Sequence, residues 1–463
     1  MLKNREMNMS QGSLLKQIIL CAIPLMCSNV LQILFNAADI AVLMLFAGEV
    51  AEDAVGAVGS TGALIHLIIG LFVGLATGAN VMVARRVGEN DPLKAEKTVG
   101  TAIASSLVIG VFLMIVGYFG AGTFLTWMGC TPALLPMATT YLQIYFLGMP
   151  VIMLYNFSSA ILRSVGDTTR PLIYLALGGI LNIGLNILFV VGFHKTVEGV
   201  AIATVASNAV SAVLCVITLL KSDGFSRLKP SRIRFYGQEL LDIIRVGIPA
   251  GVQGCVFSLS NVIIQSGLHS LGKEVVSGNT LAYQFDGLIF QAVNGIVLST
   301  VVFVSQNFGA RNFARIRRTV RYSLCLASGF GILFGALILA ISRPILGMLT
   351  DNQAVLEAAN LRLIYMGSSC FLCGIMDTMS QTMRGLGKST LAMVVTIFGT
   401  CVLRILWMTF FFPMEPFHNL ESIYLAYPAS WAITLGIYLI LYFPTMKRME
   451  RRYGAPASNS AAA

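Results

Sequence analysis

The residues of this sequence best suited to chemistry lie inside an otherwise apolar stretch. The segment NVLQILFNAAD places amides and a carboxyl at steps of three, four and three residues, which is one continuous stripe on a helix: Asn29, Gln32, Asn36 and Asp39. A bare carboxylate in hydrocarbon is so costly that Asp39 must face protein or a water-filled cavity, bind a cation, or take up a proton. Asp39 is therefore a candidate cation-coupling residue, with a structural polar contact between helices as the alternative. Gln32 and Asn36 are candidate substrate-contacting residues.

A second polar feature is the segment ILNIGLNILFVVG, residues 180–192, which places Asn182 and Asn186 one helical turn apart. An amide can donate to a carboxylate or offer its oxygen to a cation, and it adds no charge. The next apolar stretch, GVAIATVASN, supplies the Thr204 hydroxyl, although a lone threonine in such a helix is more often a packing residue. We predict one cation-coupling cluster, made of Asp39, Asn182, Asn186 and Thr204.

The second half of the chain carries its own polar groups at membrane depth. They are candidate substrate-contacting residues: Gln284, Asp286, Gln291, Asn294 and Asp377. Arg404 is the one basic residue that we place well inside an apolar segment. Because Arg404 could neutralise Asp377, a structural ion pair and a functional carboxylate are both open interpretations of Asp377.

The composition indicates which elements position these groups. The 463 residues are 56% hydrophobic and 11% charged, with a mean hydropathy of +0.79, whereas a soluble domain has about 25% charged residues. The apolar runs are longer than membrane strands and do not alternate, so we predict an all-α integral membrane protein. Its twelve predicted spans are 17–46, 57–84, 98–120, 135–162, 171–193, 199–220, 240–268, 278–305, 320–341, 355–383, 390–413 and 422–446. Between the third and fourth spans, the Gly- and Pro-rich segment GAGTFLTWMGCTPALLP is the predicted break.

The basic residues predict how the chain is oriented. Of 31 Lys and Arg, 26 lie in the two termini and in alternate loops, and the exceptions are Lys195, Lys273, Arg343, Arg362 and Arg404. By the positive-inside rule, both termini of this multi-pass protein face the cytoplasm, in the cell (inner) membrane. The net charge of +10 then follows from topology, so no nucleic-acid partner is expected.

The sequence also repeats itself at an offset of 221 residues. ARRVGENDPLKAEKTV (84–99) aligns with SQNFGARNFARIRRTV (305–320), and LRSVGDTT (162–169) aligns with MRGLGKST (383–390). Both copies keep their basic loops on the same side, so the halves share one orientation. We predict a cytoplasmic N-terminus (1–16), an N-lobe of six helices (17–220), a cytoplasmic linker with the start of the seventh helix (221–245), a C-lobe of six helices (246–446) and a cytoplasmic tail (447–463).

Several of these motifs, taken in order, resemble the multidrug and toxic compound extrusion (MATE) family. They are IPLMCSNVLQILFNAADIAVLMLFAG with Pro24 and Asp39, the asparagine followed by GVAIATVASN, the repeated RSVGDTT and RGLGKST, and SQNFGARN. The resemblance extends from about residue 12 to residue 447 and is closest to the prokaryotic DinF-like branch. It implies a V-shaped fold of two pseudo-symmetric six-helix lobes. It also implies an antiporter that exports amphipathic, often cationic, organic compounds against an inward flow of H⁺ or Na⁺.

The resemblance also bears on single residues. In the DinF-like branch, the first-lobe cation site corresponds to Asp39, Asn182 and Thr204, where Na⁺ could bind. That branch usually has an aspartate where this chain has Asn186, so one carboxyl stands where two would be expected, which favours H⁺ over Na⁺. Asp377 falls where the NorM-like branch has a second-lobe acidic ligand, whereas Phe257 lies near the place of the acidic partner of that ligand.

Two other classes of function have less support in the sequence. A flippase or exporter of a lipid-linked precursor would need a strongly cationic cavity for diphosphate, whereas most of the buried charges here are acidic. An enzyme would need a metal-ligand spacing, a nucleophile motif or a phosphate loop, and we find none in the sequence. The sequence thus predicts a transporter that is not an enzyme and uses no cofactor. Its expected partners are small amphipathic substrates, a coupling ion and the lipid bilayer, and it is expected to be a monomer.

Overall fold

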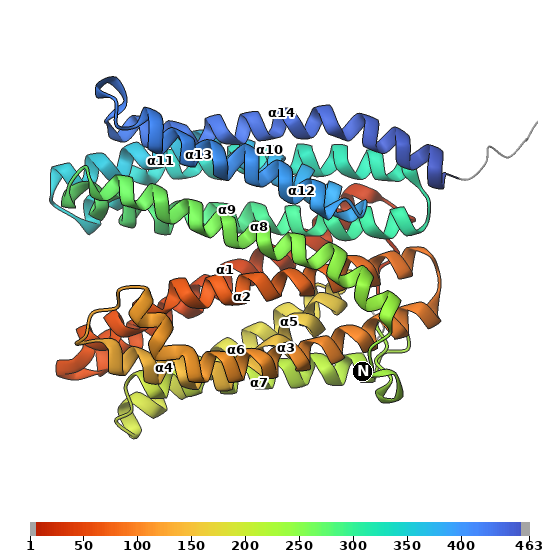
Figure 1. Cartoon of the computed structure of the whole chain (residues 1–463), viewed down its shortest axis with the longest axis horizontal. Helices are drawn as coiled ribbons and strands as arrows, with labels where there is room; N and C mark the ends of the chain where they lie inside the picture. Colours follow the sequence, from red (N-terminus) through yellow and green to blue (C-terminus); the bar gives the residue numbers. More distant parts are fainter. Residues whose placement is uncertain (1–5, 455–463) are drawn as a thin grey trace, which may run out of the picture. The chain divides into compact units, whose positions relative to one another are not determined.

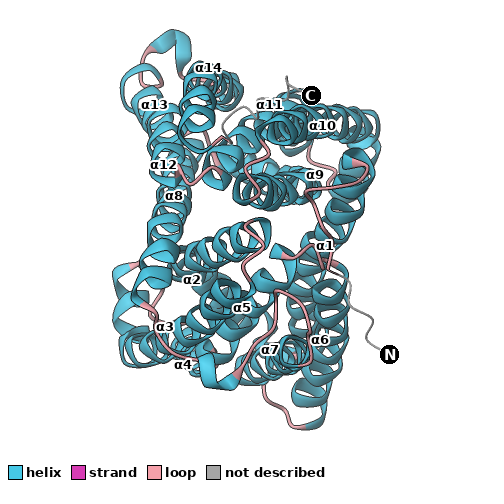
Figure 2. Ribbon diagram, turned by 90° about the vertical axis from the view of Figure 1, so that its right-hand side faces the viewer, coloured by secondary structure: helices cyan, strands magenta, loops and turns pink. Residues whose placement is uncertain are grey.

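The computed structural model describes residues 6–454, apart from the side chains of Ala63 and His66, and this part of the chain is helical without any strand (Figure 2). Most of the predicted tail 447–463 lies outside the described residues. The final helix continues to Tyr453, seven residues beyond the predicted end of the last span.

The helices follow one another along the chain with short connections (Figure 1). In the first half they are α1 (Leu14–Phe46), α2 (Ala51–Gly88), α3 (Pro92–Trp127), α4 (Leu135–Leu147), α5 (Met149–Ser164), α6 (Thr169–Ile187), the π-helix η2 (Leu188–Gly192) and α7 (Val197–Leu220). In the second half they are α8 (Gly237–His269), α9 (Lys273–Gly309), α10 (Phe313–Leu349), α11 (Gln353–Gly385), α12 (Ser389–Thr396), the π-helix η4 (Ile397–Val402), α13 (Leu403–Leu406), the π-helix η5 (Trp407–Phe411) and α14 (Leu420–Tyr453). Three single 3₁₀ turns complete the described part: η1 (Gly48–Val50), η3 (Pro230–Arg232) and η6 (Glu415–Phe417).

The described helices confirm the prediction of a multi-pass helical membrane protein. Eleven of them are long and apolar enough to cross a membrane, and the bent pair α4–α5 brings the number of spans to 12. Every predicted span overlaps one of these elements. The helices are longer than the predicted spans because the polar residues at their ends continue the helix beyond the apolar run. The predicted break after the third span is also confirmed, since α3 ends at Trp127 and α4 begins at Leu135.

The fourth span departs from the single helix predicted over 135–162. The chain bends by 52° between α4 and α5, at Gly148. Pro150 has no N–H to donate to the preceding turn, which weakens the helix at this point. A Cβ at Gly148 would lie 2.3 Å from Val205 Cγ2. The absence of a side chain at the bend therefore lets α7 approach it closely.

The chain divides into two compact units. The first unit comprises residues 6–8, Cys27–Val87 and Asp91–Cys255. The second unit comprises Met9–Met26, Gly88–Asn90 and the chain from Val256 onwards. Helices α1 and α8 each contribute residues to both units.

The repeat at an offset of 221 residues is visible in the backbone of the turns. Asn90 and Arg311 are equivalent positions, and both have a positive φ, of 53° and 56°. The next residue in each copy, Asp91 or Asn312, caps the following helix by accepting a hydrogen bond from the backbone N–H three residues later. Gly166 and Gly387 form a second matching pair, with φ of 84° and 77°. The two halves therefore keep the same turn geometry where their side chains differ.

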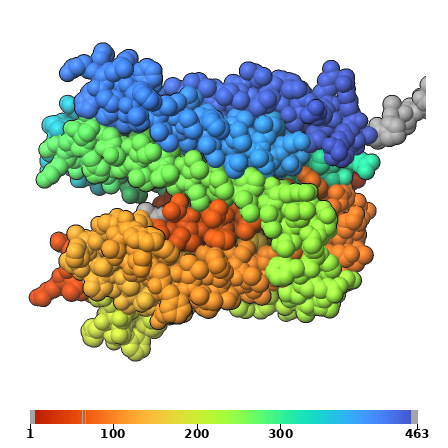
Figure 3. All heavy atoms as spheres, in the orientation of Figure 1, coloured from red at the N-terminus to blue at the C-terminus, as the bar shows by residue number. Residues whose placement is uncertain are grey.

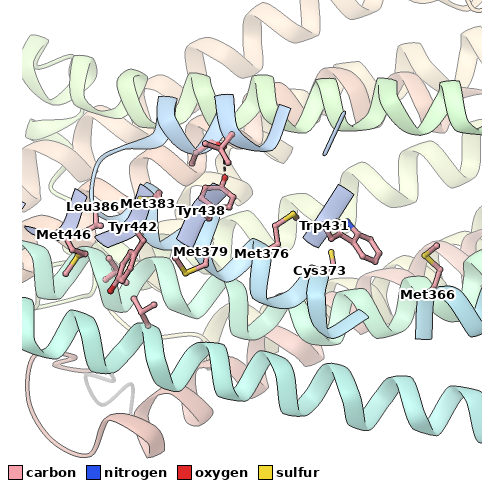
Figure 4. Close-up of a cluster of buried hydrophobic side chains, with 14 of the residues drawn as sticks. Met366, Cys373, Met376, Met379, Met383, Leu386, Trp431, Tyr438, Tyr442 and Met446 are labelled. Atoms are coloured by element: carbon pink, nitrogen blue, oxygen red, sulfur yellow. Dashed lines mark hydrogen bonds between the residues drawn. The ribbon is translucent and has the colours of Figure 1, made fainter. Parts of the chain in front are cut away.

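The core of the second unit is rich in methionine (Figure 4). Four buried methionines of α11 lie near α14, which contributes Met446: Met366, Met376, Met379 and Met383. The Tyr438 hydroxyl ties α14 to α12 by donating to the Ala392 carbonyl at 2.8 Å. Unbranched, polarisable methionine side chains fill irregular gaps between helices, so this core tolerates changes in helix packing.

In the first unit, glycines bring α2 and α8 into backbone contact. A Cβ at Gly74 would lie 2.2 Å from the Gly251 nitrogen, and a Cβ at Gly78 would lie 2.3 Å from the Ile243 carbonyl oxygen. From the other side, a Cβ at Gly251 would lie 2.1 Å from the Leu71 carbonyl oxygen. Small residues at such a crossing allow the close approach that van der Waals contact between membrane helices requires.

We expect Gly251→Ala to lower the thermal stability of the protein in detergent, since overpacking at a closed contact costs about 1–3 kcal/mol. Gly254→Ala is the matched control on the same helix, because a Cβ there meets nothing within 4 Å. The control should be neutral, or stabilising by up to about 1 kcal/mol through helix propensity. Equal melting temperatures for the two variants would show that the glycine contact does not hold these helices.

Candidate functional site

In the first unit, the asparagine pair of α6 contacts the carboxyl of α1. Asn186 Nδ2 donates to Asp39 Oδ1 at 2.6 Å and to Asn182 Oδ1 at 3.3 Å. Asn182 Nδ2 donates in turn to Thr204 Oγ1 on α7 at 3.4 Å. One chain of hydrogen bonds thus joins three helices. The structure brings the four predicted residues together, and their role in coupling stays a prediction.

Helix geometry explains how the cluster is positioned. The four-residue step between Asn182 and Asn186 places both amides on the face of α6 that is turned inward, and they are 5% and 0% exposed. Directly after them, α6 passes into the π-helical turn η2 (Leu188–Gly192). Such turns shift the helix register and are frequent at functional sites. Asp39 is only partly buried, so the carboxyl lies at the boundary between the hydrogen-bonded cluster and open space.

The Asn186 amide has an unused acceptor. Its Oδ1 atom is buried and accepts no hydrogen bond from the described residues, while its Nδ2 atom donates to the Asp39 carboxylate. An ionised carboxyl needs a donor, and a protonated carboxyl needs an acceptor. By turning over its amide, Asn186 can supply either one. The cluster is therefore chemically able to accommodate both protonation states of Asp39.

A cavity of about 580 Å³ opens beside the cluster, within the first unit. The predicted substrate residues Gln32 and Asn36 line it, as do Asp39, Asn182 and Thr204. Among its described lining side chains Asp39 is the one that carries a charge. Sequence reasoning missed several polar lining residues from α4, α5 and α7: Tyr141, Tyr145, Tyr155, Asn156 and Asn208. Tyr141 and Tyr145 are one turn apart in an apolar segment, the same spacing signal that identified the asparagine pair.

The second unit contains a separate cavity of about 570 Å³ with a buried ion pair in its wall. Arg362 Nε lies 2.7 Å from Asp286 Oδ2, and the two residues are 4% and 2% exposed. Asn279 Oδ1 accepts from Arg362 Nη1 at 2.5 Å and from the Tyr424 hydroxyl at 3.3 Å. Arg362 is buried in this wall, a place that the sequence did not indicate for it. Its distance from Asp286 in sequence hid the pair.

Asp377 lines the same cavity, but it does not form an ion pair with Arg404 in the described part of the chain. The Cys373 thiol donates to Asp377 Oδ2 at 3.8 Å. Arg404 Nε donates instead to Ser430 Oγ at 2.9 Å, and the guanidinium carbon lies 4.3 Å from the centre of the Tyr427 ring. Aromatic faces therefore stabilise the Arg404 charge in place of a carboxylate.

The remaining predicted residues of α9 divide between two faces of the helix. Gln291 and Asn294 line the second cavity, and Asn294 Nδ2 donates to Gln291 Oε1 at 3.4 Å. Gln284 is exposed and is not a lining residue of this cavity. A step of two residues leads from Gln284 to Asp286, which places their side chains on opposite faces of the helix.

Twelve apolar spans, an internal repeat and a cavity with isolated carboxyl groups in each unit define a membrane transporter rather than a scaffold. The MatE family model matches residues 24–188 and 249–408, one segment in each half. The chain therefore belongs to the MATE family, and the predicted family is confirmed.

Relatives of known name are similar over almost the whole chain. The chain is 26% identical to "Probable multidrug resistance protein YoeA" of Bacillus subtilis. The similarity extends over 442 residues, which is 94% of each protein. It is 24% identical over 394 residues to "Probable multidrug resistance protein NorM" of Thermotoga maritima, covering 84% of each. Among solved structures, a MOP superfamily transporter from Pyrococcus furiosus matches with a TM-score of 0.89 at 22% identity, over 96% of this chain and 99% of that chain. The structural match confirms the predicted fold class.

The buried pair in the second cavity can be tested through stability. Replacing Asp286 or Arg362 alone leaves a charge without its partner in a low-dielectric interior, so we expect each of Asp286→Leu and Arg362→Met to cost about 3–5 kcal/mol. The double variant should regain most of that loss. For Asp377→Leu and Arg404→Met, which do not form an ion pair in the described part of the chain, the double variant should regain a much smaller share of the loss. Thermal or denaturant unfolding of the six variants measures both cycles, and additive losses at Asp286 and Arg362 would contradict the pairing.

Proposed function

We propose that this transporter is a cation-coupled antiporter that exports amphipathic organic compounds, chiefly cationic ones, by alternating access, and that H⁺ is its coupling ion. The names of its relatives support multidrug export as the activity. The observation that carries the proposal is Asp39, the one charged side chain among the described residues that line the first cavity.

A single carboxyl in a cavity large enough for cargo can couple the movement of a proton to the opposite movement of a cation. A proton and a cationic cargo both neutralise Asp39, so binding of either one weakens the binding of the other. Inward release of the proton regenerates the carboxylate for cargo, and outward protonation expels the cargo. The tyrosines and amides around Asp39 supply contact area and hydrogen bonds without adding charge. The cavity can therefore accept many cations that share little beyond an apolar body.

The contacts of Asp39 favour H⁺ over Na⁺. Asn186 Nδ2 donates to one carboxylate oxygen and to Asn182 Oδ1, so N–H donors already occupy two of the oxygens that a Na⁺ ion would need. Asn186 provides an amide where a second carboxylate would strengthen Na⁺ binding. We therefore assign coupling to Asp39, with Asn182, Asn186 and Thr204 as its supporting residues. Na⁺ at Asp39, Asn182 and Thr204 is the alternative.

The second cavity is proposed to assist cargo binding. Asp286 is paired with Arg362, which leaves Asp377 as the carboxyl without an arginine partner within ion-pair distance among the described residues of that cavity. Gln291 and Asn294 add hydrogen-bonding capacity beside it. The flippase alternative is less well supported. Among the described residues that line this cavity, the one guanidinium is already bound to a carboxylate and would not be free to hold a diphosphate.

The proposed setting follows the positive-inside rule. The protein lies in the cell membrane as a monomer, with both termini in the cytoplasm. The proposed lobes are residues 17–220 and 246–446, with cytoplasmic segments 1–16, 221–245 and 447–463.

Asp39→Asn should abolish export driven by a pH gradient, because it removes the titrating proton while keeping the shape and part of the hydrogen bonding. Cargo movement in proteoliposomes under an imposed pH gradient measures the effect. Asp91→Asn is the matched control: Asp91 caps α3 from an exposed loop, and asparagine caps equally well. Normal gradient-driven transport by folded Asp39→Asn would remove Asp39 from the coupling mechanism.

Asn186→Asp should give the transporter a dependence on Na⁺. Two adjacent carboxylates repel each other unless a cation or a proton lies between them, so the added charge should strengthen Na⁺ binding. Wild-type transport should respond to a pH gradient and not to a Na⁺ gradient, whereas the variant should respond to Na⁺. Separately imposed gradients at a clamped membrane potential distinguish the two ions. Strong Na⁺-driven transport by the wild type at zero pH gradient would overturn the assignment of H⁺.

A further inference from the structure

A third cavity, lined by different residues from the two cavities above, lies in the second unit where α12 begins and α14 ends. Its volume is about 750 Å³, and its wall includes Lys388, Thr390, Pro444, Thr445 and Arg448. Helices α12 and α14 run side by side at the surface here (Figures 1 and 3). Two basic groups and two hydroxyls therefore line one pocket, which is a donor set for phosphate oxygens.

The basic residues of this pocket are not used inside the protein. Within residues 6–454, neither Lys388 nor Arg448 has a carboxylate within 4 Å. The nearby acid Glu450 is held by Arg317, with 2.8 Å between Nη1 and Oε2. A shallower groove continues the positive surface along α14, lined by Pro444, Lys447, Arg448, Arg451 and Arg452. The positive charge of the pocket is therefore available to an external anion.

The equivalent place in the first unit is filled by the chain's own carboxylates. At the offset of 221 residues, Lys388 corresponds to Asp167, which caps α6 by accepting from the Arg170 backbone N–H at 3.2 Å. Just beyond α7 in the first unit, residues 222–226 surround the Glu6 carboxylate. Its oxygens accept from the backbone N–H groups of Phe225 and Ser226, both at 3.1 Å. At this turn the second unit has Lys388 in place of Asp167, and none of the described residues that line its pocket is a carboxylate.

Exposed apolar side chains lead away from the pocket along both helices. On α14, Ile440 is 74% and Phe443 is 68% exposed, and they share a face with Pro444 and Arg448. Beside them, Val394 on α12 is 40% exposed, and Phe398 one turn later is 61% exposed. The surface thus changes from apolar to basic over about two helical turns. A molecule that matches it has an apolar chain and an anionic head.

We infer that the groove between α12 and the end of α14 binds an anionic phospholipid, with its phosphate between Lys388 and Arg448 and its acyl chains along Ile440 and Phe443. Basic pockets between membrane helices recognise such head groups through charge-assisted hydrogen bonds, and the adjacent hydrocarbon surface restricts the site to lipids. The site is independent of Asp39 and of the transport proposal, because none of its residues lines the cavity of Asp39 or the cavity of Asp377.

The test measures the melting temperature of detergent-solubilised protein during titration with phosphatidylglycerol, phosphatidylcholine, or inorganic phosphate. We expect phosphatidylglycerol to raise the melting temperature in a saturable way, and the other two to have little effect. The variant Lys388→Asp/Arg448→Gln should lose at least half of that rise. Lys388→Asp gives the second unit the helix-capping residue that the first unit has in Asp167, so the variant should fold.

The matched control is Lys221→Gln/Arg245→Gln, which removes two exposed basic residues of the first unit that lie outside this groove. The control should keep the full phosphatidylglycerol response. An equal loss in both double variants would mean that lipid binds by overall charge, and would overturn the site. Equal stabilisation by inorganic phosphate would indicate a site for soluble anions and would overturn the assignment to lipid. If Lys388→Asp/Arg448→Gln does not fold, Lys388→Gln alone decides, because a full response there also overturns the site.

Discussion

Hydrocarbon offers no hydrogen-bond partner, so each polar group that this chain places at membrane depth has to find one inside the protein. Much of the structure follows from how those partners are supplied. Asp39 is held by the amide of Asn186, Asp286 by the guanidinium of Arg362, and Arg404 by Ser430 and aromatic ring faces. Each of these contacts joins side chains from two or more helices, so those helices must lie at matching depths and present the right faces to one another. The polar groups therefore help to fix how the helices pack.

The kind of partner decides what a buried carboxyl can do. The guanidinium of Arg362 beside Asp286 favours the ionised form of the carboxyl, because protonation would leave the guanidinium charge unbalanced. An amide beside Asp39 makes no such demand, since it is neutral and can present either a donor or an acceptor. The first unit therefore holds a carboxyl that can change its state during a cycle. In the second unit, the Asp286 carboxyl is bound in an ion pair, whereas Asp377 lies beside the Cys373 thiol.

The internal repeat preserves geometry and varies chemistry. The turns before α3 and α10 share a residue with left-handed backbone conformation, followed by a residue that caps the helix. These residues are Asn90 and Asp91 in one copy and Arg311 and Asn312 in the other. The turns before α6 and α12 keep a glycine with positive φ, because an L side chain is strained there. The residue after that glycine differs in charge, Asp167 against Lys388. The backbone angles of these turns are therefore the same in the two copies, while the charges beside them differ. The surface of each unit can thus bind a different partner.

The sequence by itself determined the class of protein, the twelve spans, the repeat and the pairing of Asp39 with the asparagines. Hydropathy and helical spacing are local properties of the chain, so a polar stripe such as Asn182 and Asn186 can be recognised before any contact is known. It did not determine the 52° bend at Gly148, which requires α7 to fill the angle, or the placement of Gln284 outside the second cavity. Only the tertiary structure paired Asp286 with Arg362, separated Asp377 from Arg404 and gathered Lys388 with Arg448. The members of each pair are far apart along the chain. Which charges meet depends on the rotation and depth of the helices. The packing of whole helices sets both, and local residue spacing does not encode them.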